Sequence, residues 1–277
     1  MRKVLRQAIF PLGLLLVAIA LLTSLQRQMI FFPQTATEPE LLREADRIGL
    51  QPWRDASDAL IGWRSPARDT AAARMLVFHG NAGYALHREY YVSGLQALGD
   101  SWDVSLFEYP GYGARTGTAS AESFRESAAA AMDLLLAEDD RPLYLLGESL
   151  GSGVASYLAG RFPAQVAGLL LVTPFTSLAE VAGHHFPILP VRALLSENFD
   201  SVKYLQGYKG PVAFLVAGSD EVVPTELGQA LHDGYRGPKW LRVVPGAGHN
   251  TLPMYPRDPW WAEASAFLGF GGGDRLL

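Results

Sequence analysis

The chain has 277 residues, of which 49% are hydrophobic and 18% are charged, and its formal net charge is −5. This length and composition suit one large domain with a buried core and argue against a disordered chain. The negative charge disfavours a nucleic-acid partner, because binding to phosphates requires clustered Lys and Arg. There is no cysteine, which excludes thiol catalysis, disulfides and cysteine-based metal sites.

The N-terminus has the pattern of a membrane anchor. Arg2, Lys3 and Arg6 precede residues 8–25, which carry no charge and as a helix would span roughly 27 Å, enough for a bilayer core. A cleaved signal peptide is the alternative, but no A-x-A-like cleavage site follows the segment. Because only Arg27 follows closely, the bias of positive charge places the N-terminus in the cytoplasm. The rest of the chain is then expected on the far side, in the periplasm if the protein is bacterial.

Two short strands are predicted after this segment. Residues 29–33 and 59–64 are short runs rich in aromatic and β-branched residues. Residues 64–73 contain a proline and polar residues and are interpreted as the turn of a long hairpin.

From there on, the pattern changes to short apolar runs that alternate with helical segments. The predicted strands are 74–78, 103–109, 142–147, 168–174, 211–218 and 240–246, and the helical segments include 121–138 and 153–162. Apolar strands separated by helices indicate a mostly parallel sheet covered on both faces, the α/β class. In such sheets ligands bind outside the carboxyl ends of the strands.

The predicted domain organisation follows from these patterns. We expect an anchor (or signal peptide) at 1–28, one hydrolase-like α/β domain at 29–270 and a flexible tail at 271–277. The stretch 176–210 is too long for a simple crossover, and we interpret it as a crossover helix with a small cap. A cap of this size predicts a fairly open cleft.

The stretch "YLLGESLGSG" places Ser149 between Gly147 and Gly151. Gly-x-Ser-x-Gly is a weak signal alone, but here it follows an apolar run and precedes a helical segment. A sharp strand-to-helix turn of this kind exposes the serine hydroxyl, and the glycines leave room for the tight backbone. Ser149 is therefore the candidate nucleophile.

A serine nucleophile needs a base and an acid that orients the base. His249 lies in a Gly-rich loop directly after the last predicted strand, and Asp220 lies at the end of the strand before it. Asp220 is preferred to Glu221 because it is closer to the strand end. The chain order Ser149, Asp220, His249 is the order expected for a nucleophile elbow of this kind.

The other five histidines are assigned no catalytic role. His79 is expected to hold its loop by hydrogen bonds, and His184 and His185 to lie in the cap near the substrate. No role is assigned to His87 or His232.

The remaining requirement is an oxyanion hole built from backbone N–H groups. One donor is expected from Leu150, the residue after the nucleophile. The other is expected from the loop after an earlier strand, here "FHGNAG" (78–83), and Asn81 is the candidate.

Eight stretches carry a resemblance to a known family: "FFP" after the anchor, "FHGNAG", "YPGYG" (109–113), "GESLGSG" (147–153), "FTSL" (175–178), "SENFDSV" (196–202), "GSDEVVP" (218–224) and "GHNTL" (248–252). From about Met29 to Leu268 the chain resembles the α/β-hydrolase superfamily, and within it the ABHD-type membrane-anchored serine hydrolases. The resemblance implies a Ser–Asp–His triad, no metal or other cofactor, and ester, thioester or lipid-like acyl substrates. Related proteins often have an acidic residue where this chain has Thr251, so the local support of His249 differs.

The sequence thus predicts a serine hydrolase that cleaves carboxylic esters or thioesters through an acyl-enzyme. Its expected partners are a small-molecule or lipid-like acyl substrate and, through the N-terminal helix, a membrane, but no nucleic acid. A serine peptidase on the same fold and a non-catalytic binding protein are the alternatives. Dehalogenase chemistry is disfavoured because it requires a carboxylate in place of Ser149.

Overall fold

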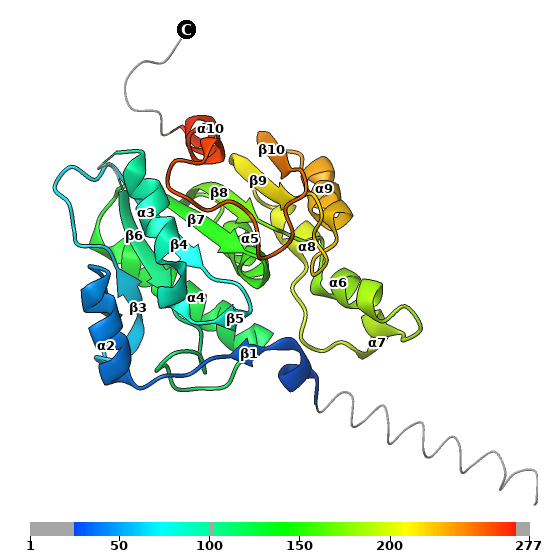
Figure 1. Ribbon diagram of the computed structural model, residues 1–277, viewed down its shortest axis with the longest axis horizontal. Coiled ribbons are helices and arrows are strands. Elements are labelled where there is room, and N and C mark those ends of the chain that lie inside the picture. Colours follow the sequence, from blue (N-terminus) through cyan, green and yellow to red (C-terminus); the bar gives the residue numbers. More distant parts are fainter. Residues whose placement is uncertain (1–24, 100–101, 270–277) are drawn as a thin grey trace, which may run out of the picture.

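The computed structural model describes residues 25–99 and 102–269, and its centre is a twisted sheet of eight strands (Figure 1). The strand order is β10-β9-β8-β7-β4-β6-β3-β2, and β3 runs antiparallel to both of its neighbours in this sheet. Its strands are β2 (Gln51–Arg54), β3 (Leu60–Arg64), β4 (Ala73–Phe78), β6 (Trp102–Phe107), β7 (Leu143–Glu148), β8 (Val166–Val172), β9 (Val212–Ala217) and β10 (Lys239–Val244). A separate parallel pair joins β1 (Phe32–Pro33) to β5 (Ala82–Gly83).

Helices cover both faces of the large sheet (Figure 1). One face carries α4 (Ala121–Glu138), α5 (Leu150–Arg161), α8 (Ser201–Leu205) and α9 (Thr225–Gly234). The other carries α2 (Glu38–Arg47), the short 3₁₀ helix η1 (Ala85–Arg88), α3 (Glu89–Ala97) and α10 (Pro259–Leu268). Two more helices, α6 (Leu178–His185) and α7 (Val191–Leu194), extend to one side of the molecule.

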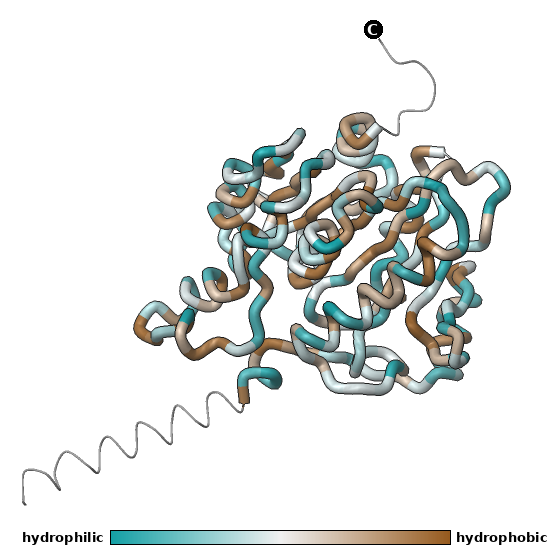
Figure 2. Tube along the Cα trace, turned by 180° about the vertical axis from the view of Figure 1, so that it is seen from behind, coloured by the Kyte–Doolittle hydropathy of each residue, from teal (hydrophilic) through white to brown (hydrophobic). Residues whose placement is uncertain are grey.

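The central strands are apolar on both faces because each face has a core of its own. Along β4, Leu76 and Phe78 belong to the core under α4 and α5, whereas Met75 and Val77 belong to the core under α3 and α10. Successive side chains of a strand point to opposite faces, so a strand between two helical layers is a continuous apolar run. Figure 2 shows these hydrophobic strands inside a more hydrophilic outer layer.

The predicted helix 121–138 coincides with α4. Ser120 caps its N-terminus, because the Ser120 hydroxyl accepts a hydrogen bond from the backbone N–H of Ser123 at 3.0 Å. Its buried residues recur every three or four positions, as required for a helix that covers a sheet: Ala121, Phe124, Ala128, Ala129, Ala131, Met132 and Leu135.

Two predictions from the N-terminal part are corrected by the structure. The stretch 64–73 is not the turn of a hairpin, because β6 lies between β3 and β4 in the sheet. Turn residues mark where a chain reverses and do not determine which strand becomes its neighbour. The predicted strand 29–33 is strand only at Phe32–Pro33, since residues 25–30 are helical.

Residues 1–24 and 270–277 lie outside the described residues, and with them nearly all of the predicted anchor and tail. Among the described helices, none combines the length and the apolar character needed to cross a bilayer. The predicted cap, 176–210, contains α6, α7 and α8, and α8 packs against α5.

Candidate active site

Ser149 lies in a sharp turn between β7 and α5, with φ 50° and ψ −116°. This backbone conformation is disfavoured for a residue with a Cβ atom. The turn is tight because two glycines allow close contacts. A Cβ on Gly151 would lie 2.1 Å from the carbonyl oxygen of Phe78, and a Cβ on Gly147 would lie 2.4 Å from that of Gly151. A larger residue at position 151 would therefore push the turn at Ser149 away from the end of β4.

Three loops at the carboxyl ends of the strands bring together Ser149, His249 and Asp220. The Ser149 Oγ lies 3.0 Å from His249 Nε2, and His249 Nδ1 lies 2.7 Å from Asp220 Oδ2. Because a carboxylate only accepts hydrogen bonds, Nδ1 carries the proton and donates it to Asp220. Nε2 is then free to accept the hydroxyl hydrogen of Ser149. The imidazole is thus in the tautomer that a general base requires.

The Asp220 carboxylate is fixed on its second oxygen as well. Oδ1 accepts hydrogen bonds from the backbone N–H groups of Val222 at 2.9 Å and Val223 at 2.7 Å, and the side chain is only 2% exposed. Three donors therefore hold the Asp220 carboxylate in one position beside His249. Glu221, the alternative acid, lies beside Gly248 instead.

Thr251 contributes to the loop of His249. Its hydroxyl accepts a hydrogen bond from the backbone N–H of Gly248 at 2.8 Å. The threonine that stands in place of an acidic residue therefore closes the turn around His249 by itself, in the manner of a short side-chain-to-backbone turn.

The backbone N–H groups of Leu150 and Asn81 are available to bind an oxyanion, since neither donates a hydrogen bond to any residue within the described ranges. The Asn81 side chain holds its loop from both ends of the amide. Its Oδ1 accepts hydrogen bonds from the backbone N–H of Phe32 at 3.1 Å and from the Tyr112 hydroxyl at 3.0 Å, and its Nδ2 donates to the carbonyl of Ile30. The loop 78–83 is therefore attached through Asn81 to Ile30 and Phe32, near the start of the described chain.

Comparison with known proteins identifies the family. The family model described as alpha/beta hydrolase fold matches residues 73–193. An uncharacterized protein of Mycobacterium tuberculosis is 37% identical over 238 residues, which cover 84% of this chain and 83% of that protein. The chain belongs to the α/β-hydrolase superfamily.

The hydrolase is also similar to lysophosphatidylserine lipase ABHD12 of Xenopus tropicalis, with 30% identity over 203 residues that cover 65% of this chain. It spans about half of that relative (51%). Among solved structures, Est1E from Butyrivibrio proteoclasticus superposes with a TM-score of 0.59 at 16% identity, covering 79% of this chain and 96% of Est1E. The Pyrococcus furiosus esterase Pf2001 superposes with a TM-score of 0.62 at 15% identity, covering 88% and 98%. These two structures share the fold. Within this superfamily the chain is a serine hydrolase of the lipase and esterase type.

Within the described ranges, His79 forms no hydrogen bond with Ser149, Asp220 or His249. It holds the loop 78–83 by side-chain hydrogen bonds, as the sequence predicts. Its Nδ1 donates to the Gly80 carbonyl at 2.7 Å, and its Nε2 lies 3.2 Å from Glu108 Oε1. The Tyr109 hydroxyl donates to the His79 carbonyl at 3.0 Å. Glu108 is fully buried and also accepts a hydrogen bond from the backbone N–H of Ala85.

A second buried cluster, which sequence reasoning missed, surrounds Glu148, the residue before the nucleophile. Its carboxylate is bound by the Arg88 guanidinium at 3.0 Å and by the hydroxyls of Tyr90 at 2.8 Å and Tyr91 at 3.0 Å. Burial alone would raise the pKa of Glu148, but these donors more than offset it and the pKa lies below its usual value. A charged residue between Gly147 and Ser149 was the only signal of this cluster in the sequence.

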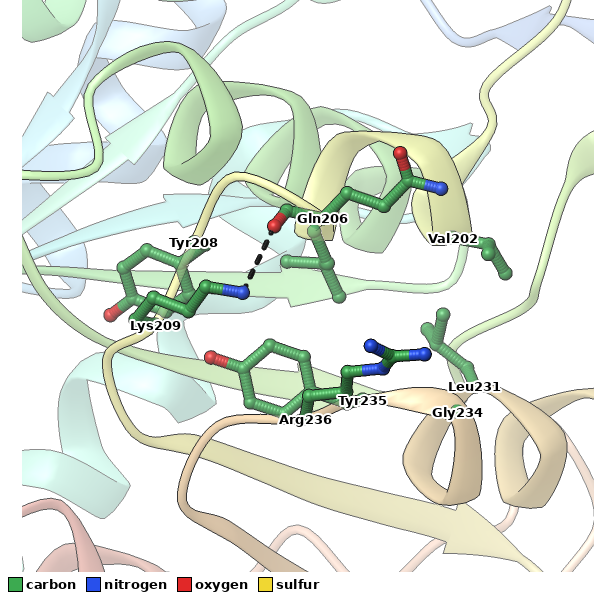
Figure 3. Close-up of a pocket in the computed structure, with 9 residues that line it drawn as sticks. Val202, Gln206, Tyr208, Lys209, Leu231, Gly234, Tyr235 and Arg236 are labelled. Carbon is green, nitrogen blue, oxygen red and sulfur yellow. Dashed lines mark hydrogen bonds between the residues drawn. The ribbon is translucent and has the colours of Figure 1, made fainter.

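Cavities in the described part of the hydrolase differ in their relation to the triad. A cavity of about 230 Å³ lies against His249 and is lined in part by Arg88, Glu148 and Thr173. The cleft in Figure 3, of about 470 Å³, lies between α8 and α9, and its lining contains no triad residue. The larger of these two cavities is therefore not the one that His249 lines.

His184 and His185, which the sequence assigns to the cap, are the last two residues of α6. His184 lines a cleft of about 740 Å³ within the cap region. The Nε2 atom of His185 donates to the carbonyl of Val222 at 2.8 Å. These contacts attach α6 to the loop that carries Asp220.

Proposed function

We propose that the hydrolase cleaves carboxylic esters or thioesters of lipid-like acyl groups, with Ser149 as nucleophile, His249 as general base and Asp220 as the acid that orients it. The observation that carries this proposal is the unbroken line of hydrogen bonds from Ser149 Oγ through both imidazole nitrogens to Asp220. A serine hydroxyl is a weak nucleophile until a neighbouring base accepts its proton. The line of contacts supplies that base and holds it in the required tautomer.

The reaction follows from this geometry. As Ser149 Oγ attacks the substrate carbonyl carbon, its proton passes to His249 Nε2, and the carbonyl oxygen becomes an oxyanion that accepts hydrogen bonds from the N–H groups of Leu150 and Asn81. The bond to the leaving group breaks, the leaving alcohol or thiol takes the proton from Nε2, and the acyl group remains on Ser149. Water then attacks the acyl-enzyme with the same proton transfers in sequence, which releases the acid and restores Ser149. Each oxyanion donor contributes about 3 kcal/mol to such a transition state.

The proposed substrate class is argued from a relative and from the N-terminal segment. A relative named as a lysophosphatidylserine lipase is 30% identical over the matched region, and the uncharged residues 8–25 would keep the enzyme at a membrane. Both favour acyl lipids over water-soluble esters. In this proposal the N-terminal helix remains attached and the catalytic domain lies outside the cytoplasm. Sequencing the mature N-terminus tests retention, because a chain that begins near Gln26 would contradict it.

Substitution of the nucleophile tests the catalytic part of the proposal. We expect Ser149→Ala to lower kcat by about 10⁶-fold, as for other serine hydrolases that lose the nucleophile, and to abolish labelling by a fluorophosphonate. Ser152, buried one helical turn away, offers a matched control, and Ser152→Ala should retain labelling. A folded wild-type protein that gives no adduct on Ser149 would support a non-catalytic binding protein instead.

A panel of substrates tests the specificity. Acyl esters of increasing chain length, acyl thioesters and peptide amides are compared by kcat/KM in the wild type, with Ser149→Ala as background. We expect turnover of esters and thioesters that increases with acyl length. Turnover of amides alone would favour a serine peptidase.

A further inference from the structure

Large apolar side chains that face solvent are concentrated on two segments of the described chain. Six of the ten such residues within 25–99 and 102–269 belong to these segments. They are Leu25, Met29 and Phe32 in one segment and Phe186, Ile188 and Leu189 in the other. Single exposed apolar residues are ordinary, but clusters of them mark surfaces that bind a partner or a membrane.

The second segment is the loop between α6 and α7, with the sequence Phe-Pro-Ile-Leu-Pro from residue 186 to residue 190. Ile188 at its tip is 94% exposed, and its neighbours Phe186 and Leu189 are 47% and 42% exposed. The prolines at 187 and 190 restrict the backbone of the loop. Nearly all of the Ile188 side chain and about half of the Phe186 side chain are therefore left to solvent.

The start of the described chain is bound next to this loop. Gln26 donates from Nε2 to the carbonyl of Leu194 at 2.5 Å, and its Oε1 accepts from the backbone N–H of Ser196 at 2.8 Å. Arg27 forms an ion pair with Glu197 at 2.6 Å. Figures 1 and 2 both place the helical residues 25–30 and the α6–α7 loop along the same edge of the molecule.

We propose that the α6–α7 loop inserts into a phospholipid leaflet, the same leaflet at which the chain emerges before Leu25. Residues 8–24 carry no charge and are long enough to occupy most of a bilayer core. Because Gln26 and Arg27 are bound at the end of α7, a membrane anchor in residues 8–24, as proposed above, would keep the loop beside the membrane surface. Insertion then buries the exposed side chains of Phe186, Ile188 and Leu189.

The charges at this edge are compatible with a lipid surface. Arg192 on α7 is paired with Glu180, and its side chain remains 77% exposed. Arg27 is paired with Glu197 and remains 53% exposed. Exposed guanidinium groups beside an apolar loop can meet lipid phosphates while the apolar residues enter the acyl region.

The docked loop would lie close to the catalytic loops. His185, the last residue of α6, donates a hydrogen bond to the carbonyl of Val222, whose own N–H binds Asp220. The inserted segment and the acid of the triad are therefore connected through one residue. A leaflet held at α6 and α7 brings acyl lipids to the edge of the sheet where Ser149 lies.

The absence of cysteine from the sequence allows a direct test. In the full chain, Ile188→Cys is labelled with the environment-sensitive fluorophore NBD and the protein is reconstituted with phosphatidylcholine and phosphatidylglycerol vesicles. Tyr255→Cys is the matched control, because Tyr255 is 77% exposed and lies in the loop between β10 and α10, outside both apolar segments. We expect blue-shifted emission at residue 188, quenched by lipids with nitroxide-labelled acyl chains, and neither effect at residue 255.

Equal aqueous emission from both labelled positions would overturn the proposal. Because this readout needs no turnover, it is independent of the catalytic proposal. As a second measurement, Ile188→Asp should lower hydrolysis of a long-chain substrate in vesicles several-fold and leave kcat/KM for a water-soluble ester unchanged. Equal losses on both substrates would instead indicate that Ile188 supports the folded site.

Discussion

The loops that carry Ser149, Asp220 and His249 follow strands of the large sheet, whereas the loop 186–190 joins the helices α6 and α7, and the two regions are built in opposite ways. At the site, polar groups are buried and paired: Asp220 has three hydrogen-bond donors, and both ends of the Asn81 amide are bound. At the α6–α7 loop, Ile188 is almost fully exposed. The hydrogen bonds at the site hold polar side chains in fixed positions before a substrate binds. The exposed loop instead leaves an apolar surface that can contact a membrane or another molecule. Substitutions in the two regions should therefore have very different effects.

After loss of the nucleophile itself, the largest expected effect on the site side is at Asp220. Asp220→Asn should lower kcat by about 10⁴-fold with little change in stability, because an amide can donate to Nδ1 and so favours the wrong tautomer of His249. Steady-state kinetics, with thermal unfolding as a check, measures this. Glu221→Gln is the control and should leave kcat unchanged. If Glu221→Gln lost activity and Asp220→Asn kept it, the orienting acid would be Glu221.

The next effect is on stability, through the buried cluster around Glu148. Glu148→Gln leaves the Arg88 guanidinium, whose side chain is 15% exposed, without its counter-ion, and breaking a largely enclosed pair of this kind costs at most roughly 3–5 kcal/mol. Urea unfolding of both proteins measures the difference. The exposed pair of Arg64 and Glu138 is the control, and Glu138→Gln should change stability by less than about 1 kcal/mol.

This cluster also predicts a pH dependence. The pKa of Glu148 in the folded protein lies below its ordinary value of 4.5, so its charge stabilises the folded state fully above that pH. The contribution is lost as the pH falls below 4.5 and through the folded pKa. The stability gap between wild type and Glu148→Gln should therefore be constant near neutral pH and shrink in acid. A gap that widens in acid would contradict this account.

A smaller effect is expected at Asn81, whose side chain holds the loop but whose backbone N–H is the proposed donor. Asn81→Ala keeps that N–H and removes its support, so kcat should fall roughly 10- to 100-fold, less than or equal to the loss of a whole oxyanion donor, while KM changes little. Tyr112→Phe, which removes one of the two donors to Oδ1, should cause a smaller loss. An unchanged kcat in Asn81→Ala would mean that the β1–β5 pairing alone holds the loop.

The smallest effect is expected in the α6–α7 loop. Ile188→Ser should change the free energy of unfolding by less than about 0.5 kcal/mol, as for other exposed positions. Leu76→Ala, in a fully buried position of β4, should cost about 2–5 kcal/mol. Denaturant unfolding in the absence of lipid compares them. A large decrease in the free energy of unfolding for Ile188→Ser would show that the loop packs on the domain in solution.

Much of the fold could be predicted from the sequence because its strongest signals are local. Six strands of the large sheet, β4 and β6 to β10, correspond to predicted apolar runs, and α4 has both a serine cap and a regular apolar spacing. The β3 partner could not be predicted, since β6 begins at Trp102, 38 residues after β3 ends at Arg64. Helix α2 and strand β2 were not predicted. Both are short and bury few residues, so the spacing of their apolar residues gives only a weak periodic signal.

In the candidate site, too, features with a local sequence signal could be predicted and contacts between distant residues could not. Ser149, Asp220 and His249 could be named because each follows the end of a predicted strand, where loops of a parallel sheet converge. Their distances come from the structure, and their roles stay predictions. The partners of Asn81 and Glu148 could not be named, because Phe32 is 49 residues from Asn81, and Arg88 is 60 residues from Glu148. Polar contacts of that kind leave no periodic trace in the sequence.

The backbone at Ser149 also bears on how this enzyme can change over time. Its conformation, with φ 50°, costs a residue with a Cβ atom about 1–3 kcal/mol, and glycine alone would adopt it without that penalty. Mutations that relieve the strain at this position therefore also remove the hydroxyl. Selection for a more durable fold and selection for turnover act in opposite directions at this one residue, and a more heat-resistant descendant must find its extra stability elsewhere in the molecule.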